Sequence, residues 1–350
     1  GKVLFIAPKG QLTSKKKMLC TYIFLVVDSI PLVWYIIGVV NNSIKKGQEL
    51  MKVIAFINNK GGVGKTASVT TIGHMMATVH GKKVLLVDLD PQGNTSGRYS
   101  QTNFIDIFTA IMERRPIETE LSIEDVLLNP DMDIHKSIKH TDYEGLDIIP
   151  SHLTLAEVEE RLKADITTPQ QFKLKKALKQ VAGEYDYCLI DCSPSISILN
   201  INGLTAADEV YIPLRCDGDS CIGLAITRNL VETVSEYNPL LHIGGTFLTQ
   251  YNNRKNVSRE VYGLLEQILP RYEIPLLPIC IGTTKYLEEN TFEQRPLLEV
   301  DSGKNKCSVT LAYMKLTEYI ISPNKKKFIE KYQRELKEIE RMRQEEEKEI

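Results

Sequence analysis

A glycine-rich loop between an apolar run and a helix-compatible run constrains this chain more than any other stretch. The apolar run is Val53–Ile57, the loop NNKGGVGKT occupies Asn58–Thr66, and the helical run is Ala67–Val79. Glycines let a backbone curl so that successive N–H groups point inward and can hold phosphate oxygens. The following helix would direct its positive N-terminal end at the same place. This order of strand, loop and helix predicts a site for a phosphate-bearing ligand.

The end of the loop suits a nucleotide with a metal ion. Lys65 supplies a positive charge for the outer phosphates, and the hydroxyl of Thr66 is a suitable Mg²⁺ ligand. The strict pattern G-x-x-x-x-G-K-[ST] would need glycine at position 59, where the chain has Asn59. An additional lysine, Lys60, precedes the glycines. A glycine turn without a ligand is the alternative interpretation.

Two acidic motifs follow later apolar runs. Lys83–Val87 precedes the sequence DLDPQGN at residues 88–94, and Tyr187–Ile190 precedes DCSPS at residues 191–195. Together with the KGGVGKT loop, and in this order, they resemble the deviant Walker A, switch I and Walker B motifs of the ParA/MinD family of ATPases. The resemblance covers about residues 52–319 and is strongest to the ParA/Soj partition branch.

This resemblance implies ATP and Mg²⁺ as cofactors. Lys65 and the loop amides would hold the β- and γ-phosphates, while Thr66 and Asp191 would bind Mg²⁺ and Asp88 would support the metal shell. Asp90 would orient or activate the attacking water. A capped turn after a strand is the alternative for Asp88 and Asp90. The residues expected to contact the nucleotide are Lys60, Gly61, Gly62, Val63, Gly64, Lys65, Thr66, Ala67 and Pro213.

The additional lysine carries the most specific implication. In the family, a lysine at the place of Lys60 reaches the partner's phosphates across a dimer that encloses the nucleotide, in the manner of an arginine finger supplied in trans. The expected catalytic set is therefore Lys60, Lys65 and Asp90. ATP binding would drive homodimerisation, and hydrolysis would drive disassembly, which makes the protein a switch. A solvated loop lysine is the alternative.

Strand-like and helix-like runs alternate from Met51 onward. Strands separated by crossover helices predict an α/β fold with a mainly parallel, doubly wound sheet flanked by helices, of the P-loop NTPase type. Ligands in such sheets bind at the carboxyl ends of the strands, where all three motifs fall. Residues 98–145 are more polar, and we expect a helical excursion there. The expected strands are Val53–Ile57, Lys83–Asp88, Leu146–Ile149, Asp186–Asp191, Glu209–Leu214, Ile243–Thr249 and Pro275–Ile279, and helices are expected from Ser151, Pro169 and Asn256.

Composition limits the partners. The net charge is −2, so DNA binding would need a local basic patch. The seven cysteines include no C-x-x-C pair, which indicates free thiols in a reducing cytosol and disfavours an iron–sulfur site. By resemblance, basic residues in two later regions would bind DNA non-specifically by neutralising phosphates, although ordinary solvated cations are the alternative. These candidates are Arg254, Lys255, Arg259 and Lys285.

The two ends differ from the ATPase domain that we assign to residues 51–322. Within residues 1–50, a mostly apolar run at 21–40 is long enough to span a bilayer but contains Asp28 and Pro31. We keep three interpretations: a non-native extension before a natural start at Met51, a membrane anchor, or a surface hairpin or helix. Residues 323–350 mix both charges around a regular apolar stripe, which predicts one long amphipathic helix. That helix either packs by its stripe or meets a partner.

The sequence thus favours a ParA-type switch that binds DNA non-specifically and positions plasmid, chromosome or mobile-element DNA. It would be cytoplasmic and nucleoid-associated, with slow Mg²⁺-dependent ATP hydrolysis stimulated by a ParB-like or helix-turn-helix centromere-binding partner. A membrane-associated MinD-like or tyrosine-kinase-like regulator is the alternative, and a membrane contact is possible only through residues 21–40. An iron–sulfur carrier and a DNA-bound co-repressor are further classes.

Overall fold

The computed structural model describes the chain from residue 51 onward, with short gaps. The described residues are 51–99, 109, 112–113, 120–287 and 295–349. The chain divides into two units, Gly1–Leu50 and Met51–Ile350, and all that follows concerns the second. The apolar run at 21–40 lies outside the described residues, so its three interpretations stay predictions. Within the described residues, no helix combines the length and apolar character needed to cross a bilayer.

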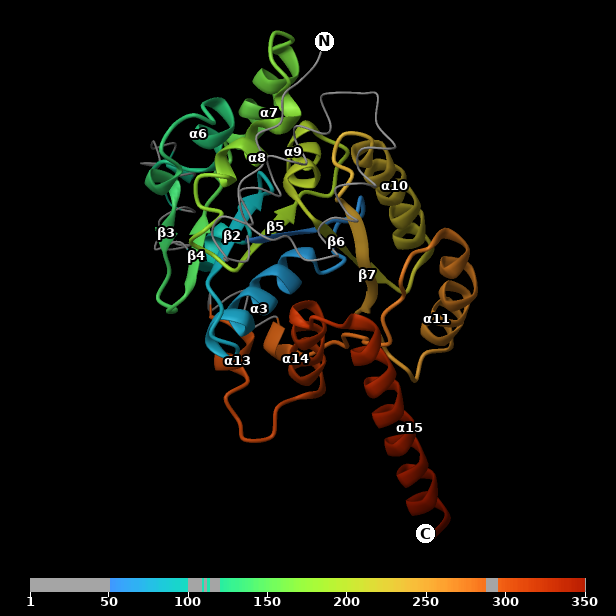
Figure 1. Ribbon diagram of the computed structural model, residues 1–350. Helices are drawn as coiled ribbons and strands as arrows, with labels where there is room; N and C mark the ends of the chain where they lie inside the picture. The colour runs from blue at the N-terminus through green and yellow to red at the C-terminus, as the bar shows by residue number, and fades with distance from the viewer. Residues whose placement is uncertain (1–50, 100–108, 110–111, 114–119, 288–294, 350) are drawn as a thin grey trace, which may run out of the picture. The chain divides into compact units, whose positions relative to one another are not determined.

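In the part of the chain that the structure describes, a seven-stranded sheet forms the centre, in the order β3-β4-β2-β5-β1-β6-β7 (Figure 1). Every neighbouring pair is parallel except β3 and β4, which are antiparallel. This confirms the mainly parallel, doubly wound sheet expected from the sequence. The strands are β1 Lys52–Phe56, β2 Val84–Leu89, β3 Lys139–His140, β4 Leu146–Ile149, β5 Tyr187–Cys192, β6 Glu209–Arg215 and β7 His242–Thr249.

The central strands are apolar at nearly every position because helices cover both faces of the sheet. Strand β2 shows this pattern, since all six of its residues are buried. Successive side chains of a strand point to opposite faces. Leu85 and Val87 therefore belong to the hydrophobic core on one face, and Val84 and Leu86 belong to the core on the other.

Helices form a layer on each face (Figure 1). The first core is closed by α6 Ile123–Leu128, α7 Leu155–Ala164, α8 Lys173–Leu178, α9 Ile198–Ala206, α10 Gly218–Ser235 and α11 Asn256–Ile268. The second core is closed by α3 Lys65–Thr78, α4 Ser96–Tyr99, α13 Leu297–Val300, α14 Ser308–Ile321 and α15 Lys325–Glu349. Short 3₁₀ segments are η1 Ile134–Ser137, η2 Gln170–Phe172 and η3 Leu269–Tyr272.

Two of the expectations for individual elements need correction. The expected strand Pro275–Ile279 is wrong, because only a single bridge joins Leu276 to Thr246 of β7. Pro275 and Pro278 lack the N–H groups that a continuous ladder requires, so regular pairing cannot continue through them. The polar stretch 98–145 holds α6 and η1 but also β3, whose two residues are too few to produce a strand pattern in the sequence.

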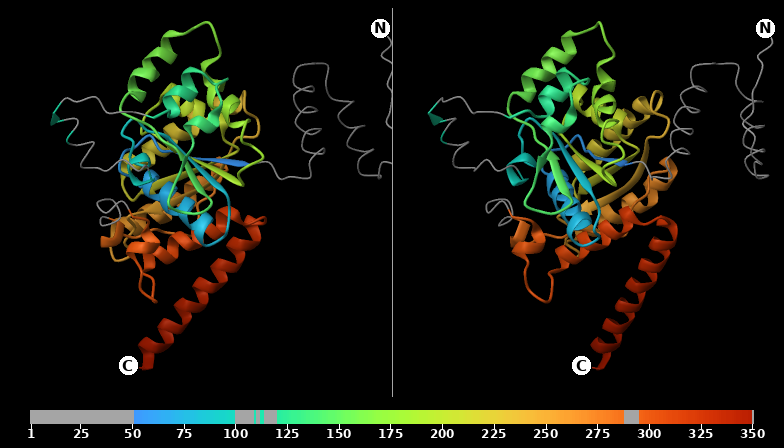
Figure 2. Two further views of the ribbon diagram at one scale, coloured as in Figure 1. Left: turned by 90° about the vertical axis from the view of Figure 1, so that its left-hand side faces the viewer. Right: turned by 60° about the vertical axis from the view of Figure 1, so that its left-hand side comes forward.

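The charged C-terminal segment is one long helix, as its apolar stripe predicts. Figure 2 shows α15 reaching beyond the sheet and the helices that cover it. Phe328 and Tyr332, near its start, pack on the second core. Ile339 and Met342, further along the stripe, are 43% and 52% exposed. The helix is therefore anchored by its first turns.

The sheet order brings the three motifs together. β2, β5 and β1 are neighbours, and each of the three motifs follows or includes the carboxyl end of one of them. Asp88 at the end of β2 stands directly beside Asp191 at the end of β5 in the parallel register. Phe56, the last residue of β1, pairs with Asp191 from the other side. The motifs therefore meet at one edge of the sheet, as predicted.

Candidate nucleotide-binding site

The glycine loop has the backbone of a phosphate cradle. Gly62 and Gly64 have φ angles of 70° and 86°, which lie in the left-handed region that favours glycine. Gly64 is the N-cap of α3, so the helix begins at Lys65, directly after the turn. The predicted contact residues from Lys60 to Ala67 thus form the loop and the first turn of α3, whose free N–H groups face any anion held there.

Residues far away in the sequence hold this loop in shape. The hydroxyl of Thr249, the last residue of β7, donates to the carbonyl oxygens of Val63 at 2.8 Å and Leu214 at 3.1 Å. The side-chain amide of Gln250 donates to the carbonyl oxygen of Gly62 at 3.1 Å. Two of these bonds occupy carbonyl oxygens of the loop itself, those of Gly62 and Val63, and so fix the backbone of its glycine turn.

Asn58 fixes the start of the loop. It is fully buried, its Nδ2 donates to the carbonyl oxygen of Pro213 at 2.9 Å, and its Oδ1 accepts from the backbone N–H of Lys60 at 2.9 Å. Pro213 is itself a buried residue of β6. The structure therefore gives Pro213 a role in holding the loop, while its contact with a nucleotide base stays a prediction.

Lys65 is buried inside the loop. Its side-chain amine donates to the carbonyl oxygen of Lys60 at 3.2 Å, and the residue is 6% exposed. Burial lowers the pKa of Lys65, whereas the nearby carboxylates of Asp191 and Asp90 act to raise it. A phosphate oxygen in the loop would give this buried cation a further anionic neighbour.

The two carboxylates at the ends of β2 and β5 form a buried acidic pair. Asp88 and Asp191 are both fully buried. Burial raises the pKa of each carboxyl, and the charge of Asp191 adds to this effect on Asp88. Oδ2 of Asp191 accepts a hydrogen bond from the hydroxyl of Thr95 at 2.7 Å, whereas Oδ1 has no hydrogen-bond partner among the residues that the structure describes.

This acidic pair fits a Mg²⁺ ion. Mg²⁺ prefers hard oxygen ligands, usually one or two carboxylates together with waters and phosphate oxygens. A buried carboxylate oxygen without a partner is costly unless a cation satisfies it. Oδ1 of Asp191 is such an atom, and Thr66, in the first turn of α3, lies close enough to Asp191 to act to lower its pKa.

The DLDPQGN segment forms a turn that carries Asp88 and Asp90. Oδ1 of Asp88 accepts from the backbone N–H of Asp90 at 3.0 Å, and Oδ1 of Asp90 accepts from that of Gln92 at 3.0 Å. Asp90 is 7% exposed. The capped turn considered from the sequence is therefore present at the edge of the candidate site. A role for Asp90 with an attacking water stays a prediction.

Lys60 lies at the rim of the loop. Its Nζ is 2.7 Å from Oδ2 of Asp219, in the first turn of α10, and the two side chains are 36% and 73% exposed. Lys60 is therefore neither buried with Lys65 nor a freely solvated loop lysine. An exposed ion pair of this kind contributes at most about 1 kcal/mol, so the lysine can change partners at low cost.

The basic candidates lie at the start of α11 and in the following segment. Arg254, Lys255 and Arg259 are exposed. Lys285 lies near the ring of Tyr286, with its amine 5.2 Å from the ring centroid. A hydrogen bond of 2.9 Å from the N–H of Tyr251 to the carbonyl oxygen of residue 281 holds the two segments side by side. The structure thus brings the regions near each other, while DNA contact stays a prediction.

Known proteins resemble this chain over most of its length. A family model described as an AAA domain matches residues 51–243, more than half of the chain. The sporulation initiation inhibitor protein Soj of Bacillus subtilis is 35% identical over 261 residues, which are 74% of this chain and 95% of Soj. The chain belongs to the ParA/Soj family of P-loop ATPases. The chromosome partitioning protein ParA of Caulobacter vibrioides is 32% identical over 275 residues, 78% of this chain and 94% of that protein.

Solved structures agree with the ParA/Soj assignment of the fold. Cobyrinic acid a,c-diamide synthase from Mycobacterium smegmatis superposes with a TM-score of 0.60 and 31% identity, covering 77% of this chain and 94% of the other. It was solved with bound ADP and magnesium, and also with an ATP analogue and magnesium. Another protein with the same fold as this ParA/Soj chain therefore binds a nucleotide and magnesium.

Several residues of this ParA/Soj site were not found from the sequence. Thr95, Ser96, Thr249 and Gln250 all contact the motif residues, but Thr249 was expected only as the end of a strand and the other three were not singled out. The available signal was small hydroxyl residues directly after a strand-end motif, which fits Thr95 and Ser96. Thr249 is 186 residues away from its partner Val63, so only the fold reveals that contact.

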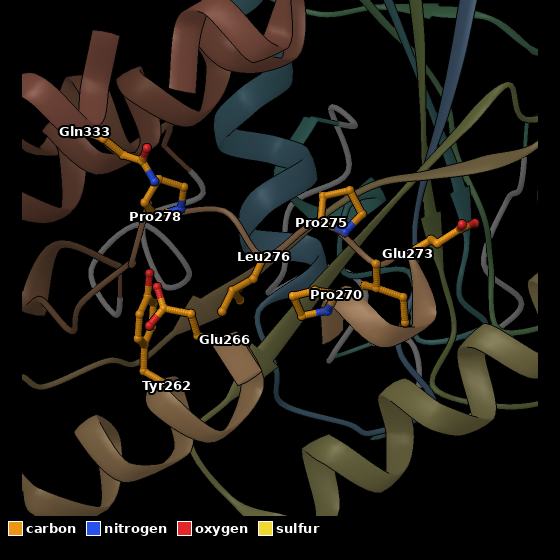
Figure 3. Close-up of a pocket in the computed structure, with 9 residues that line it drawn as sticks. Tyr262, Glu266, Pro270, Glu273, Pro275, Leu276, Pro278 and Gln333 are labelled. Carbon is orange, nitrogen blue, oxygen red and sulfur yellow. The ribbon is translucent and has the colours of Figure 1, made fainter. Parts of the chain in front are cut away.

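A separate cavity of about 340 Å³ lies away from the motifs (Figure 3). Its walls come from α11, η3, the segment after η3 and the side chain of Gln333 on α15. None of the phosphate-loop or acidic-motif residues lines it. The candidate nucleotide site is therefore the open loop at the carboxyl edge of the sheet. The cavity is lined by Tyr262, Glu266, Pro270, Glu273, Ile274, Pro275, Leu276, Pro278 and Gln333.

Proposed function

We propose that this chain is an ATP-dependent dimerisation switch of the ParA type that positions DNA. The observation that carries the proposal is the buried pair of Asp88 and Asp191 with an unpartnered carboxylate oxygen, set beside Lys65 and the glycine loop. Such a combination of anion cradle, buried cation and carboxylates suits a nucleoside triphosphate with Mg²⁺. The family assignment supports ATP as that nucleotide.

Different residues of the site would bind the phosphates, bind the metal and orient the water during hydrolysis. The loop N–H groups and Lys65 would hold the outer phosphates, and Thr66, Asp88 and Asp191 would hold Mg²⁺ directly or through water. The metal neutralises charge on the phosphates during transfer. Asp90, at the rim of the carboxylate pair, would orient the attacking water. Because the protein supplies position and charge rather than covalent chemistry, slow turnover is expected without a stimulating partner.

Lys60 would act across a dimer. Its amine is partly exposed and paired with Asp219, and the phosphates of a second copy would replace that carboxylate. A phosphate group with more than one negative charge is a stronger partner than an exposed aspartate. ATP would thus hold two copies together, and loss of the γ-phosphate would release them.

DNA would be the surface on which the switch acts. The exposed cations Arg254, Lys255 and Arg259 lie at the N-terminal end of α11, and Lys285 lies in the neighbouring segment. They would bind DNA phosphates without reading sequence, which makes the binding sensitive to salt. A ParB-like or helix-turn-helix protein on the cargo DNA would stimulate hydrolysis, and the switch would work at the nucleoid in the cytoplasm.

The proposal is tested with the purified chain, double-stranded DNA and a ParB-like or helix-turn-helix DNA-binding protein from the same genome. We expect slow ATP hydrolysis alone, faster hydrolysis with DNA and that protein together, and retention on DNA only with ATP. As a control, raising the salt concentration should weaken retention on DNA without removing nucleotide binding. DNA binding that ignores nucleotide, with no hydrolysis under any of these conditions, would contradict the proposal.

A further inference from the structure

Thr95 occupies an unusual place at the candidate metal site. It is fully buried directly before α4, and its hydroxyl donates to Oδ2 of Asp191 at 2.7 Å. The two residues are 96 positions apart in the sequence, so the contact exists only because the turn after β2 folds over the end of β5. A methyl group could fill the same space, but only the hydroxyl can donate this hydrogen bond.

The next residue makes the matching contact with the neighbouring carboxylate. The backbone N–H and the hydroxyl of Ser96 donate to Oδ2 of Asp88 at 2.8 and 2.7 Å. The hydroxyl of Ser96 in turn accepts from the backbone N–H of Ser151, after β4, at 2.8 Å. Thr95 and Ser96 together therefore bridge the ends of β2 and β5, one carboxylate each.

These contacts decide which carboxylate oxygen remains for a cation. Asp191 can present either oxygen to the site by rotating about its last side-chain bond. The bond from Thr95 holds Oδ2, and this leaves Oδ1 as the atom without a partner in the described part of the chain. Hydrogen bonds of this kind to a metal-binding group fix its orientation before the metal arrives.

We infer that Thr95 is a positioning residue for Mg²⁺, which orients Asp191 and makes the conformation of the turn after β2 depend on the metal. The inference rests on the proposed function. Because coupling between two sites is reciprocal, an ordered turn would favour Mg²⁺, and bound Mg²⁺ would favour the ordered turn. Asp90 belongs to the same turn, so its approach to the site would depend on Thr95 as well.

The test compares Thr95→Val, which keeps the shape and removes the hydroxyl, with Thr95→Ser, which keeps the hydroxyl. The measurement is the affinity for a fluorescent ADP analogue at increasing Mg²⁺ concentration, and again in EDTA. We expect Thr95→Val to need about 10-fold more Mg²⁺ for half-maximal effect, because partners of metal-binding groups typically contribute 10- to 100-fold. Thr95→Ser should restore most of the wild-type Mg²⁺ response, and affinity in EDTA should be unchanged in both.

A matched control separates this effect from the loss of any buried hydroxyl. Thr317 is also fully buried, but it lies on α14 and donates to the carbonyl oxygen of Tyr313 at 2.8 Å. Thr317→Val should leave the Mg²⁺ response at the wild-type value. If Thr95→Val does not fold, Thr95→Ala lacks the same hydroxyl, cannot overfill the site and takes its place in the comparison.

The outcomes distinguish this inference from the proposed function. A wild-type chain whose nucleotide affinity does not respond to Mg²⁺ would contradict the proposed function itself. A wild-type response that Thr95→Val or Thr95→Ala reproduces unchanged would overturn only the role of Thr95. An equal loss of affinity in EDTA and in Mg²⁺ would also overturn it, because that pattern indicates a damaged loop rather than a misplaced metal group.

Discussion

At the scale of single residues, the site keeps groups that cost stability until a ligand arrives. Asp88 and Asp191 are buried side by side, and burial raises the pKa of both carboxyls. Lys65 is the buried cation near Asp191, and burial lowers its pKa. Functional sites often hold ionisable groups in such unfavourable settings, because the ligand supplies the missing charge.

Asp88→Asn tests this cost. Burial and the neighbouring charge of Asp191 raise the pKa of Asp88, so the nucleotide-free wild-type chain should lose stability as pH rises from about 4 through that raised pKa. Asp88→Asn cannot ionise and should lose less stability over the same pH range, although its amide nitrogen cannot accept one of the hydrogen bonds that the carboxylate accepts. Nucleotide binding should lose its Mg²⁺ dependence in the same variant. Chemical unfolding and nucleotide titration measure the two effects. Asp131→Asn, at an exposed acid paired with Lys176, should change neither the pH dependence of stability nor the Mg²⁺ dependence of binding. An Asp88→Asn chain that loses as much stability as the wild type over this pH range would argue against the explanation.

The glycine loop and the acidic motifs were predictable residue by residue because each is a local pattern after a strand. The hydroxyls that hold them were not. Thr95 is 96 residues away from Asp191, and Gln250 is 188 residues away from Gly62. A threonine or glutamine in a loop carries no signal of such a contact, since only the order of the strands brings these partners together.

At the scale of elements, prolines and ion pairs determine two features that the apolar pattern does not: whether a segment pairs as a strand, and where a helix is anchored. The segment Pro275–Ile279 has the composition of a strand, but its prolines prevent regular pairing. The start of α15 is held by Lys325, which contacts the buried carboxylate of Glu209 and donates to the hydroxyl of Tyr211 at 2.7 Å. The apolar stripe predicted this helix, whereas its anchoring contact could not be read from the sequence.

Lys325→Met tests the anchor of α15. Burial alone would raise the pKa of Glu209, but contacts from His242, Lys325 and Lys52 hold it at about 2. Removing one buried partner should therefore lower the free energy of unfolding by about 1–3 kcal/mol and loosen the first turns of α15. Hydrogen exchange and chemical unfolding at pH 7 measure this. Lys326→Met, one residue further and exposed, is the control, and equal behaviour of the two variants would contradict the anchor.

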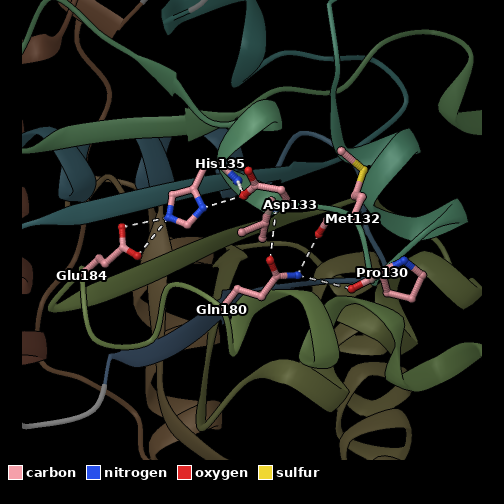
Figure 4. Close-up of polar contacts among 7 residues, drawn as sticks. Pro130, Met132, Asp133, His135, Gln180 and Glu184 are labelled. Carbon is pink, nitrogen blue, oxygen red and sulfur yellow. Dashed lines mark hydrogen bonds and ion pairs between the residues drawn. The ribbon is translucent and has the colours of Figure 1, made fainter.

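His135 links η1 to the turn before β5 in a pH-dependent way. Its ring lies between Glu184, 2.9 Å away, and Asp133, 2.7 Å away (Figure 4). Bonds to Glu184 and then Asp133 raise the pKa of His135. A raised pKa means that the folded chain binds the proton more tightly, so the contribution is complete below about pH 6.5 and is lost as pH rises through the folded pKa.

His135→Gln should therefore matter more at low pH. We expect the free energy of unfolding to fall by less than about 1 kcal/mol at pH 5.5, because the ring is half exposed, and to change little at pH 8.5. Chemical unfolding at the two pH values gives the comparison. A loss that is larger at pH 8.5 would contradict the role of the protonated ring.

At the scale of the whole molecule, the carboxyl edge of the sheet gathers everything that the proposed switch needs. The motifs on β1, β2 and β5 meet there, and Lys60 stands at the rim in an exposed ion pair with Asp219. The fold class and this edge were predictable, because alternating strands and helices permit few arrangements and place ligands at strand ends. A second copy leaves no such pattern in one chain, so the proposed dimerisation rests on the resemblance and on the partly exposed ion pair of Lys60.

Mixing two inactive variants tests this account most directly. Lys60→Ala keeps its own phosphate loop but has no lysine to lend, whereas Lys65→Ala cannot hold its own phosphates but still carries Lys60. If Lys60 acts in trans, each variant alone should hydrolyse no ATP. The mixture should regain hydrolysis at sites where the phosphate loop of a Lys60→Ala copy meets Lys60 of a Lys65→Ala copy. Light scattering should show dimers of the mixture only with ATP. A mixture as inactive as its parts, or a Lys60→Ala chain that dimerises and turns over ATP like the wild type, would contradict the account.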